Sequence, residues 1–147
     1  MLKEKRLLKL LAPRLAVCRL GPGAALPSWA LSGTFCSVTR APGELSVICP
    51  EEELPALPVK EGAAGFPAAG GPDSLRVERG FRAFQVEGPL DFELTGVLAG
   101  LLEPLAQAGI PVLAVSTFDT DYLLVRAQRV EEAIRALGQV AEVRRGG

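Results

Sequence analysis

The chain has 147 residues, of which 48% are hydrophobic and 22% charged, and its formal net charge is −1. This length allows one ordinary domain or two very small ones, and the composition is that of a globular protein rather than a disordered or membrane protein. Basic and acidic residues are interspersed and form no basic cluster, so we expect no nucleic-acid partner.

The chain contains no histidine. This excludes Ser-His-Asp and Cys-His catalytic units and any metal site with a His ligand. The three cysteines, Cys18, Cys36 and Cys49, lie in apolar runs without CxxC spacing, which indicates buried reduced thiols. Near the N-terminus, Lys9 and Arg14 interrupt the apolar residues, so we expect neither a signal peptide nor a membrane segment. The predicted location is the cytoplasm, and we expect no catalytic residues, no metal and no cofactor.

The first half of the chain is weakly patterned. Residues 1–12 predict a short amphipathic turn or a frayed terminus. The further expected elements are a strand at 14–20, at most two helical turns at 25–31, a hairpin of strands 34–39 and 44–49, and a short helix after Pro50. Extended structure is expected to resume at 75–77, and residues 78–80 to lead into the second half. Residues 60–74 contain four glycines and two prolines, which predicts a surface insertion in preference to a mobile lid.

The second half is more strongly patterned. A strand is expected at 81–87, and apolar residues at helical spacing then run from Leu94 to Leu105. Pro104 is expected to kink this helix and Gly109 to end it. Strands at 112–117 and 122–126, a helix at 130–137 and a strand at 140–143 complete the series.

This order of elements predicts an α+β, ferredoxin-like βαββαβ fold, in which two helices cover one face of a four-stranded antiparallel sheet. The first half repeats a reduced version of the same pattern. We therefore expect two tandem halves, residues 1–78 (including the 60–74 insertion) and residues 79–147.

The segments EGPLDFELTG and AGIPVLAVSTFDTDYLLV resemble ACT domains, which are small regulatory modules that bind free amino acids, and in particular the CASTOR-type subgroup. This subgroup includes animal arginine sensors and short bacterial proteins with two ACT-like halves. The resemblance covers roughly residues 12–58 and 75–140, and the glycine-rich stretch between them departs from it. It implies that Thr117, Phe118 and Asp121 belong to a ligand site.

The first candidate binding corner is the expected helix start after Gly88-Pro89. Unpaired backbone amides and the helix dipole can hold the carboxylate of an amino acid there. Two alternatives remain open, because Asp91 and Glu93 either serve only the helix itself or point into the site and select a cationic ligand. The candidate residues of this corner are Gly88, Pro89, Leu90, Asp91, Phe92, Glu93 and Leu94.

The second candidate corner is the turn Ser116–Asp121. Asp119 and Asp121 can receive an ammonium or a basic side chain, and Thr117 can donate a hydrogen bond. Each acid can equally be a plain turn former. The candidate residues of this corner are Thr117, Phe118, Asp119 and Asp121.

Together the corners predict a non-enzymatic sensor that binds a free amino acid, such as arginine or lysine, and acts as a homodimer. The competing interpretation is a structural module that binds another protein and no small molecule. An enzyme is disfavoured, since only the paired acids of a short turn could act.

Overall fold

The computed structural model describes residues 5–56, 60–61 and 75–146. The chain divides into two compact units. The C-terminal unit consists of Met1–Ala12 and Phe81–Gly147, and the N-terminal unit consists of Pro13–Gly80. The first twelve residues therefore belong with the second half of the chain. Apart from residues 60 and 61, the predicted 60–74 insertion lies outside the described residues.

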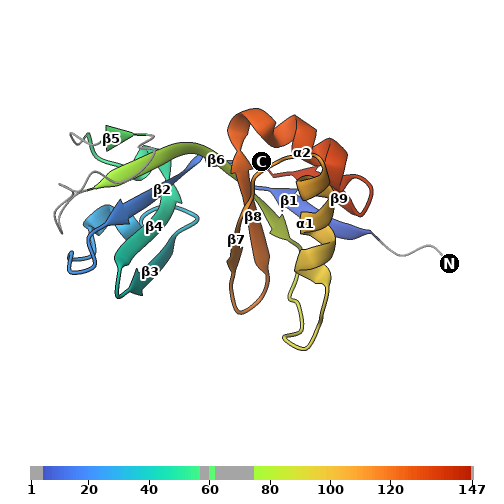
Figure 1. Cartoon of the computed structure of the whole chain (residues 1–147), viewed down its shortest axis with the longest axis horizontal. Coiled ribbons are helices and arrows are strands. Elements are labelled where there is room, and N and C mark those ends of the chain that lie inside the picture. The colour runs from blue at the N-terminus through green and yellow to red at the C-terminus, as the bar shows by residue number, and fades with distance from the viewer. Residues whose placement is uncertain (1–4, 57–59, 62–74, 147) are drawn as a thin grey trace. The chain divides into compact units, whose positions relative to one another are not determined.

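The strands and helices follow one another as labelled in Figure 1. The strands are β1 Arg6–Leu10, β2 Leu15–Leu20, β3 Ser37–Ala41, β4 Glu44–Pro50, β5 Lys60–Glu61, β6 Arg76–Val86, β7 Leu113–Ser116, β8 Asp121–Arg126 and β9 Ala141–Arg145. The helices are η1 Ser28–Leu31, η2 Glu51–Glu53, α1 Val97–Gln107, η3 Ala127–Arg129 and α2 Val130–Leu137, where η denotes a 3₁₀ turn.

The C-terminal unit has the predicted ferredoxin-like order β6-α1-β7-β8-α2-β9, with one added strand. Its described strands lie in the order β7-β8-β6-β1-β9, so β1 separates the first and last strands of the βαββαβ pattern. β1 is antiparallel to β6, with Leu8 opposite Val86, and parallel to β9, with Leu8 opposite Val143. The prediction of a four-stranded sheet was therefore wrong, and so was that of a turn or frayed end at residues 1–12 for the part of this segment that the structure describes, from residue 5. Buried Leu8 and Leu10 flank exposed Lys9, and this period of two marks a strand.

The core of the C-terminal unit lies between the sheet and its two α-helices (Figure 1). Large side chains that are at most 1% exposed fill it: Leu8, Leu10, Phe84, Leu101, Leu105, Leu123 and Leu137. Each such side chain contributes roughly 1.5–3 kcal/mol by leaving water. Helix α1 continues through Pro104, which lacks the amide that would otherwise donate to the carbonyl of Gly100, four positions earlier. None of the helices in the described part of the chain is long and apolar enough to cross a membrane.

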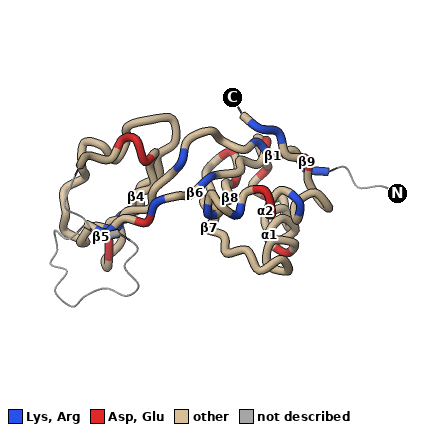
Figure 2. Tube along the Cα trace, turned by 90° about the horizontal axis from the view of Figure 1, so that it is seen from above, with Lys and Arg blue, Asp and Glu red and all other residues tan. Residues whose placement is uncertain are grey.

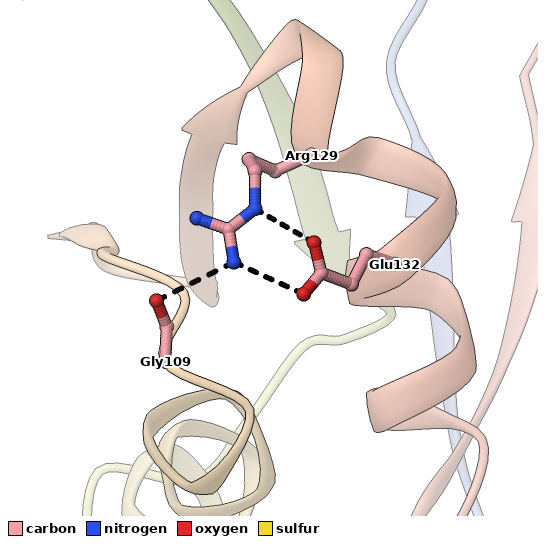
Figure 3. Close-up of polar contacts among 3 residues, drawn as sticks. All are labelled: Gly109, Arg129 and Glu132. Atoms are coloured by element: carbon pink, nitrogen blue, oxygen red, sulfur yellow. Dashed lines mark hydrogen bonds and ion pairs between the residues drawn. The ribbon is translucent and has the colours of Figure 1, made fainter.

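An arginine ties the end of α1 to the start of α2 (Figure 3). Arg129 donates to both carboxylate oxygens of Glu132, at 2.7 and 3.0 Å, and to the carbonyl of Gly109, at 3.4 Å. This ion pair raises the pKa of Arg129 and lowers the pKa of Glu132. The planar guanidinium fits such a two-oxygen contact, so the Gly109 cap of α1 is held against α2.

The N-terminal unit has a sheet in the order β3-β4-β2-β6, with β5 parallel to β6. The helix expected at 25–31 is the single 3₁₀ turn η1, because Pro27 fixes an extended backbone directly before it. Strand β6 is unbroken from Arg76 to Val86, so the extended structure expected at 75–77 and the strand expected at 81–87 form one strand through residues 78–80. Gly80, at φ 82°, lets the strand continue through a backbone conformation that favours glycine.

Candidate functional site

The loop between β6 and α1 is longer than predicted. Helix α1 begins at Val97 after Gly96, which has φ 82° and offers no side-chain cap. The amides of Leu94 and Glu93 are already used, because they donate to the carbonyl and the side chain of Asp91, at 3.0 and 2.8 Å. The helix start expected at Leu90 was therefore wrong. Asp91 stabilises a local turn instead of capping the helix.

The two predicted corners lie against each other. The Leu90 amide donates to the Asp119 carbonyl at 2.6 Å, which joins the loop to the β7–β8 turn. Gly88 permits this approach, because a Cβ there would lie 2.9 Å from the same carbonyl oxygen. The Phe92 and Phe118 rings meet edge to face, with centroids 4.8 Å apart, although they are 70% and 77% exposed. The loop and the turn thus share one backbone hydrogen bond and one aromatic contact.

The turn itself is fixed by hydroxyl groups. The Thr117 amide and hydroxyl both donate to the Thr120 carbonyl, at 2.8 and 3.1 Å, and Ser116 Oγ donates to Asp121 Oδ1 at 2.5 Å. Thr120 is only 5% exposed, and its hydroxyl donates to the Val86 carbonyl at 2.5 Å. Thr120 therefore anchors the turn to β6. The sequence interpretation did not single it out, because a threonine between two aspartates reads as a turn residue.

A pocket of about 250 Å³, called the acidic pocket below, lies where the loop, the turn and the first turn of α1 meet. None of its lining residues, all within the described part of the chain, is basic. It contains eight of the predicted site residues, namely Leu90, Asp91, Phe92, Leu94, Thr117, Phe118, Asp119 and Asp121. Its lining also includes four residues that are not among the named candidates, Val97, Leu98, Ser116 and Thr120, of which the last two lie within the predicted corner Ser116–Asp121. Gly88 and Pro89 instead line a neighbouring cavity, and Glu93 lines neither.

The charge of the acidic pocket favours a cation. Asp91, Asp119 and Asp121 lie around one small volume, and three like charges there are relieved by an opposite charge. The aromatic faces of Phe92 and Phe118 add a second attraction for a cationic group. At the other side of the pocket, the first turn of α1 has backbone amides without intrahelical partners.

Matches to known proteins cover most of the chain. The ACT domain profile matches residues 76–139, and a profile described as an N-terminal domain matches residues 14–56. A solved structure from Agobacterium tumefaciens is 30% identical and has a TM-score of 0.80, and the match covers 99% of this chain and 96% of that one.

Two more distant structures share the fold. A Vibrio cholerae protein of unknown function, described as a possible transport protein, is 22% identical with a TM-score of 0.63; the match covers 94% of this chain and 91% of that one. The regulatory subunit of aspartate kinase from Thermus flavus is 14% identical with a TM-score of 0.59; the match covers 93% of this chain and 97% of that one.

The relative of nearly equal length and the profile over β6 to α2 agree with the ferredoxin-like order of the C-terminal unit. On these grounds the chain belongs to the ACT domain family.

Proposed function

We propose that this protein is a non-enzymatic regulatory protein that binds a free amino acid in the acidic pocket. The observation that carries the proposal is the meeting of three carboxylates and two aromatic rings at the entrance of α1. The resemblance of EGPLDFELTG and STFDTD to CASTOR-type proteins points to the same residues and to a cytoplasmic sensor. Residues 1–78 and 79–147 would then be two tandem ACT-like halves, with strand β1 of the first half paired into the sheet of the second.

In this proposal, the ligand lies across the pocket. Its ammonium or basic side chain pairs with Asp119 and Asp121, and Thr117 and Phe118 lie beside it. Its carboxylate accepts hydrogen bonds from the free amides at Val97 and Leu98 instead of from residues 90–94. The ring of acids therefore favours arginine or lysine over neutral amino acids.

A sensor also needs a second state to which the ligand is coupled. The edge strand β7 leaves backbone groups unpaired on one side within the described sheet, which suits the pairing of two chains side by side. We propose a homodimer in which the ligand favours one arrangement of the subunits. Likeness to a regulatory subunit of aspartate kinase supports a regulatory role at the level of fold.

The alternative is a protein-interaction module without a small-molecule ligand. The exposure of Phe92 and Phe118, whose rings are in contact, favours this alternative, because exposed apolar side chains that lie close together often mark binding surfaces.

A thermal-shift screen over the common amino acids tests the proposal. A ligand at about 100 times its Kd stabilises the folded state by about 2.7 kcal/mol, which raises Tm by several degrees. Asp121→Asn should abolish the shift, since it removes the charge but keeps an acceptor for Ser116. The matched control is Glu103→Gln on α1, an exposed acid that lines neither the acidic pocket nor the neighbouring cavity. If no amino acid raises Tm, the interaction module is the better account.

A further inference from the structure

The larger cavity of the C-terminal unit, which Gly88 and Pro89 line, has a volume of about 650 Å³. It is called the mixed-charge cavity below. This volume is within the range of small-molecule sites. Unlike the acidic pocket it includes basic residues, and Asp119 and Thr120 of the turn line both.

The basic and the acidic residues of the mixed-charge cavity come from different strands of the sheet. Lys9 on β1 and Arg144 on β9 are direct neighbours across the parallel pair. Figure 2 shows the Lys and Arg positions along the chain in blue. Glu87 follows the end of β6, and Asp119 lies in the turn that leads into β8. Since the sheet runs β8-β6-β1-β9, the acids lie on one side and the cations on the other.

None of these four side chains makes an ion pair or hydrogen bond with another residue that the structure describes. The opposite charges of Lys9 and Glu87 therefore face one cavity without touching. Lys9 and Arg144 repel each other as cross-strand neighbours, and an oxyanion between them would remove that cost. Arg145, which also lines the cavity, is already paired with Glu131 at 2.7 and 2.9 Å.

We propose that the mixed-charge cavity is a second small-molecule site that binds a zwitterion with well-separated charges. The oxyanion of this ligand, a carboxylate or a phosphate, lies between Lys9 and Arg144. Its ammonium lies against Glu87 and Asp119. Arg144 can hold two oxygens of the anion with its planar guanidinium, and Lys9 adds a point charge.

The spacing of the subsites selects the length of the ligand. Neighbouring strands lie about 4.8 Å apart, so the cations on β1 and β9 are one to three strand spacings from the acids at β6 and β8. An α-amino acid carries both charges on one carbon and cannot span this distance with its backbone groups alone. Zwitterions with a linker between the charges fit better. The proposal does not depend on an amino acid binding in the acidic pocket.

The test is a titration of the ¹⁵N-labelled full chain by two-dimensional NMR. The probes are two zwitterions: γ-aminobutyrate, which carries a carboxylate, and phosphoethanolamine, which carries a phosphate. Butyrate and ethyl phosphate are the matched control compounds that lack the ammonium. We expect saturable shifts of the Lys9, Glu87 and Arg144 amides with at least one zwitterion, and weaker binding of its control compound. Which zwitterion binds more tightly distinguishes the carboxylate from the phosphate.

Variants show whether the named charges hold the probe. Arg144→Gln should weaken binding at least about tenfold, the effect of losing one charge-assisted hydrogen bond. Arg135→Gln removes another exposed arginine, from α2 and outside the cavity, and should leave the affinity unchanged. Asp121→Asn should also leave it unchanged, which separates this site from the acidic pocket.

Three results would overturn the proposal. The first is the absence of saturable shifts at these amides with either zwitterion up to about 10 mM, where binding energy falls below roughly 3 kcal/mol. The second is equal affinity of Arg144→Gln and the unchanged protein. The third is binding of butyrate and ethyl phosphate as tight as that of the zwitterions, because the acids at Glu87 and Asp119 would then contribute nothing.

Discussion

The two units of this chain bury their sheets in different ways. In the C-terminal unit, α1 and α2 cover the sheet, and large aliphatic side chains such as Leu105 and Leu137 fill the space between them. In the N-terminal unit the described residues include no α-helix, and η1 supplies buried Ala30 and the partly buried Trp29. The core there is built largely from small side chains, including Cys18 and Cys49.

This difference shows what a helix adds to an ACT-like sheet. A covering helix forms a layer thick enough for leucines, whereas a 3₁₀ turn leaves room for alanine and cysteine. The helix also brings a terminus with unpaired amides to the edge of the sheet. The acidic pocket is found in the unit that has such a terminus, at the start of α1.

The largest expected effect concerns the thiols, all three of which lie in the N-terminal unit. A hydrogen bond with Cys49, together with burial, raises the pKa of Cys18 far above its ordinary value. Cys36 is only partly buried. Alkylation with iodoacetamide, followed by mass spectrometry, should modify Cys36 at least about a hundredfold faster than Cys18, which corresponds to an opening free energy of about 2.8 kcal/mol.

Repeating the labelling in increasing urea reports the opening of the N-terminal unit alone, because the C-terminal unit has no cysteine. Equal labelling rates of Cys18 and Cys36 in native buffer would show that the small-residue core is open. They would contradict the description of the N-terminal unit as having a closed core of small side chains.

The second effect is a cavity in the core under the helices. Leu105→Ala should destabilise the C-terminal unit by about 2–5 kcal/mol, since Leu105 is fully buried between α1 and the sheet. Urea unfolding followed by Tyr122, the single tyrosine, measures this unit, and Trp29, the single tryptophan, measures the other. The matched control Leu113→Ala, at a position 42% exposed, should cost less than about 1 kcal/mol. Equal losses for the two leucines would contradict the described core.

The smallest effect is electrostatic and concerns the tie between α1 and α2. The hydrogen bond from Arg129 lowers the pKa of Glu132 below its ordinary value of 4.5. The ion pair therefore stabilises the folded state fully above about pH 4.5, and this contribution is lost as the pH falls through the lowered pKa. Arg129→Gln should lower Tm slightly at pH 7 and less at pH 3, and added salt should reduce the difference.

The control for this pH dependence is Arg6→Gln, which removes an exposed arginine from β1. A Tm difference between Arg129→Gln and the unchanged protein that stays constant from pH 7 to pH 3 would show that the ion pair with Glu132 contributes nothing.

Much of the second half could be predicted from the sequence, because long periodic segments such as 97–107 and 130–137 carry their own signal. The start of α1 was misplaced because Leu94 continues the apolar period of the helix. The helix begins later because the local turn at Asp91 uses the amides of Glu93 and Leu94. A hydrogen bond between Leu90 and Asp119 then holds the loop, across 29 positions of the sequence. A contact of that kind has no local signature.

The same reason explains why the mixed-charge cavity was not predicted. Lys9 and Arg144 are 135 residues apart, and only the pairing of β1 with β9 makes them neighbours. The leucines of residues 7–11 come as the adjacent pairs Leu7-Leu8 and Leu10-Leu11, which fit a helical period as well as the alternation of a strand. By contrast, eight of the eleven predicted site residues surround one pocket, because they come from two short segments flanking consecutive elements.

The position of β1 has a consequence for how this protein is made. Strand β1 pairs with β6 on one edge and with β9 on the other, so both of its edges are covered only after β9 has been synthesised. The N-terminal unit contains neither β1 nor β9 and can close before that point, whereas the ACT sheet cannot. A fragment cut at the bounds of the matching ACT profile, residues 76–139, would lack two of the five strands and expose the unpaired edge of β6.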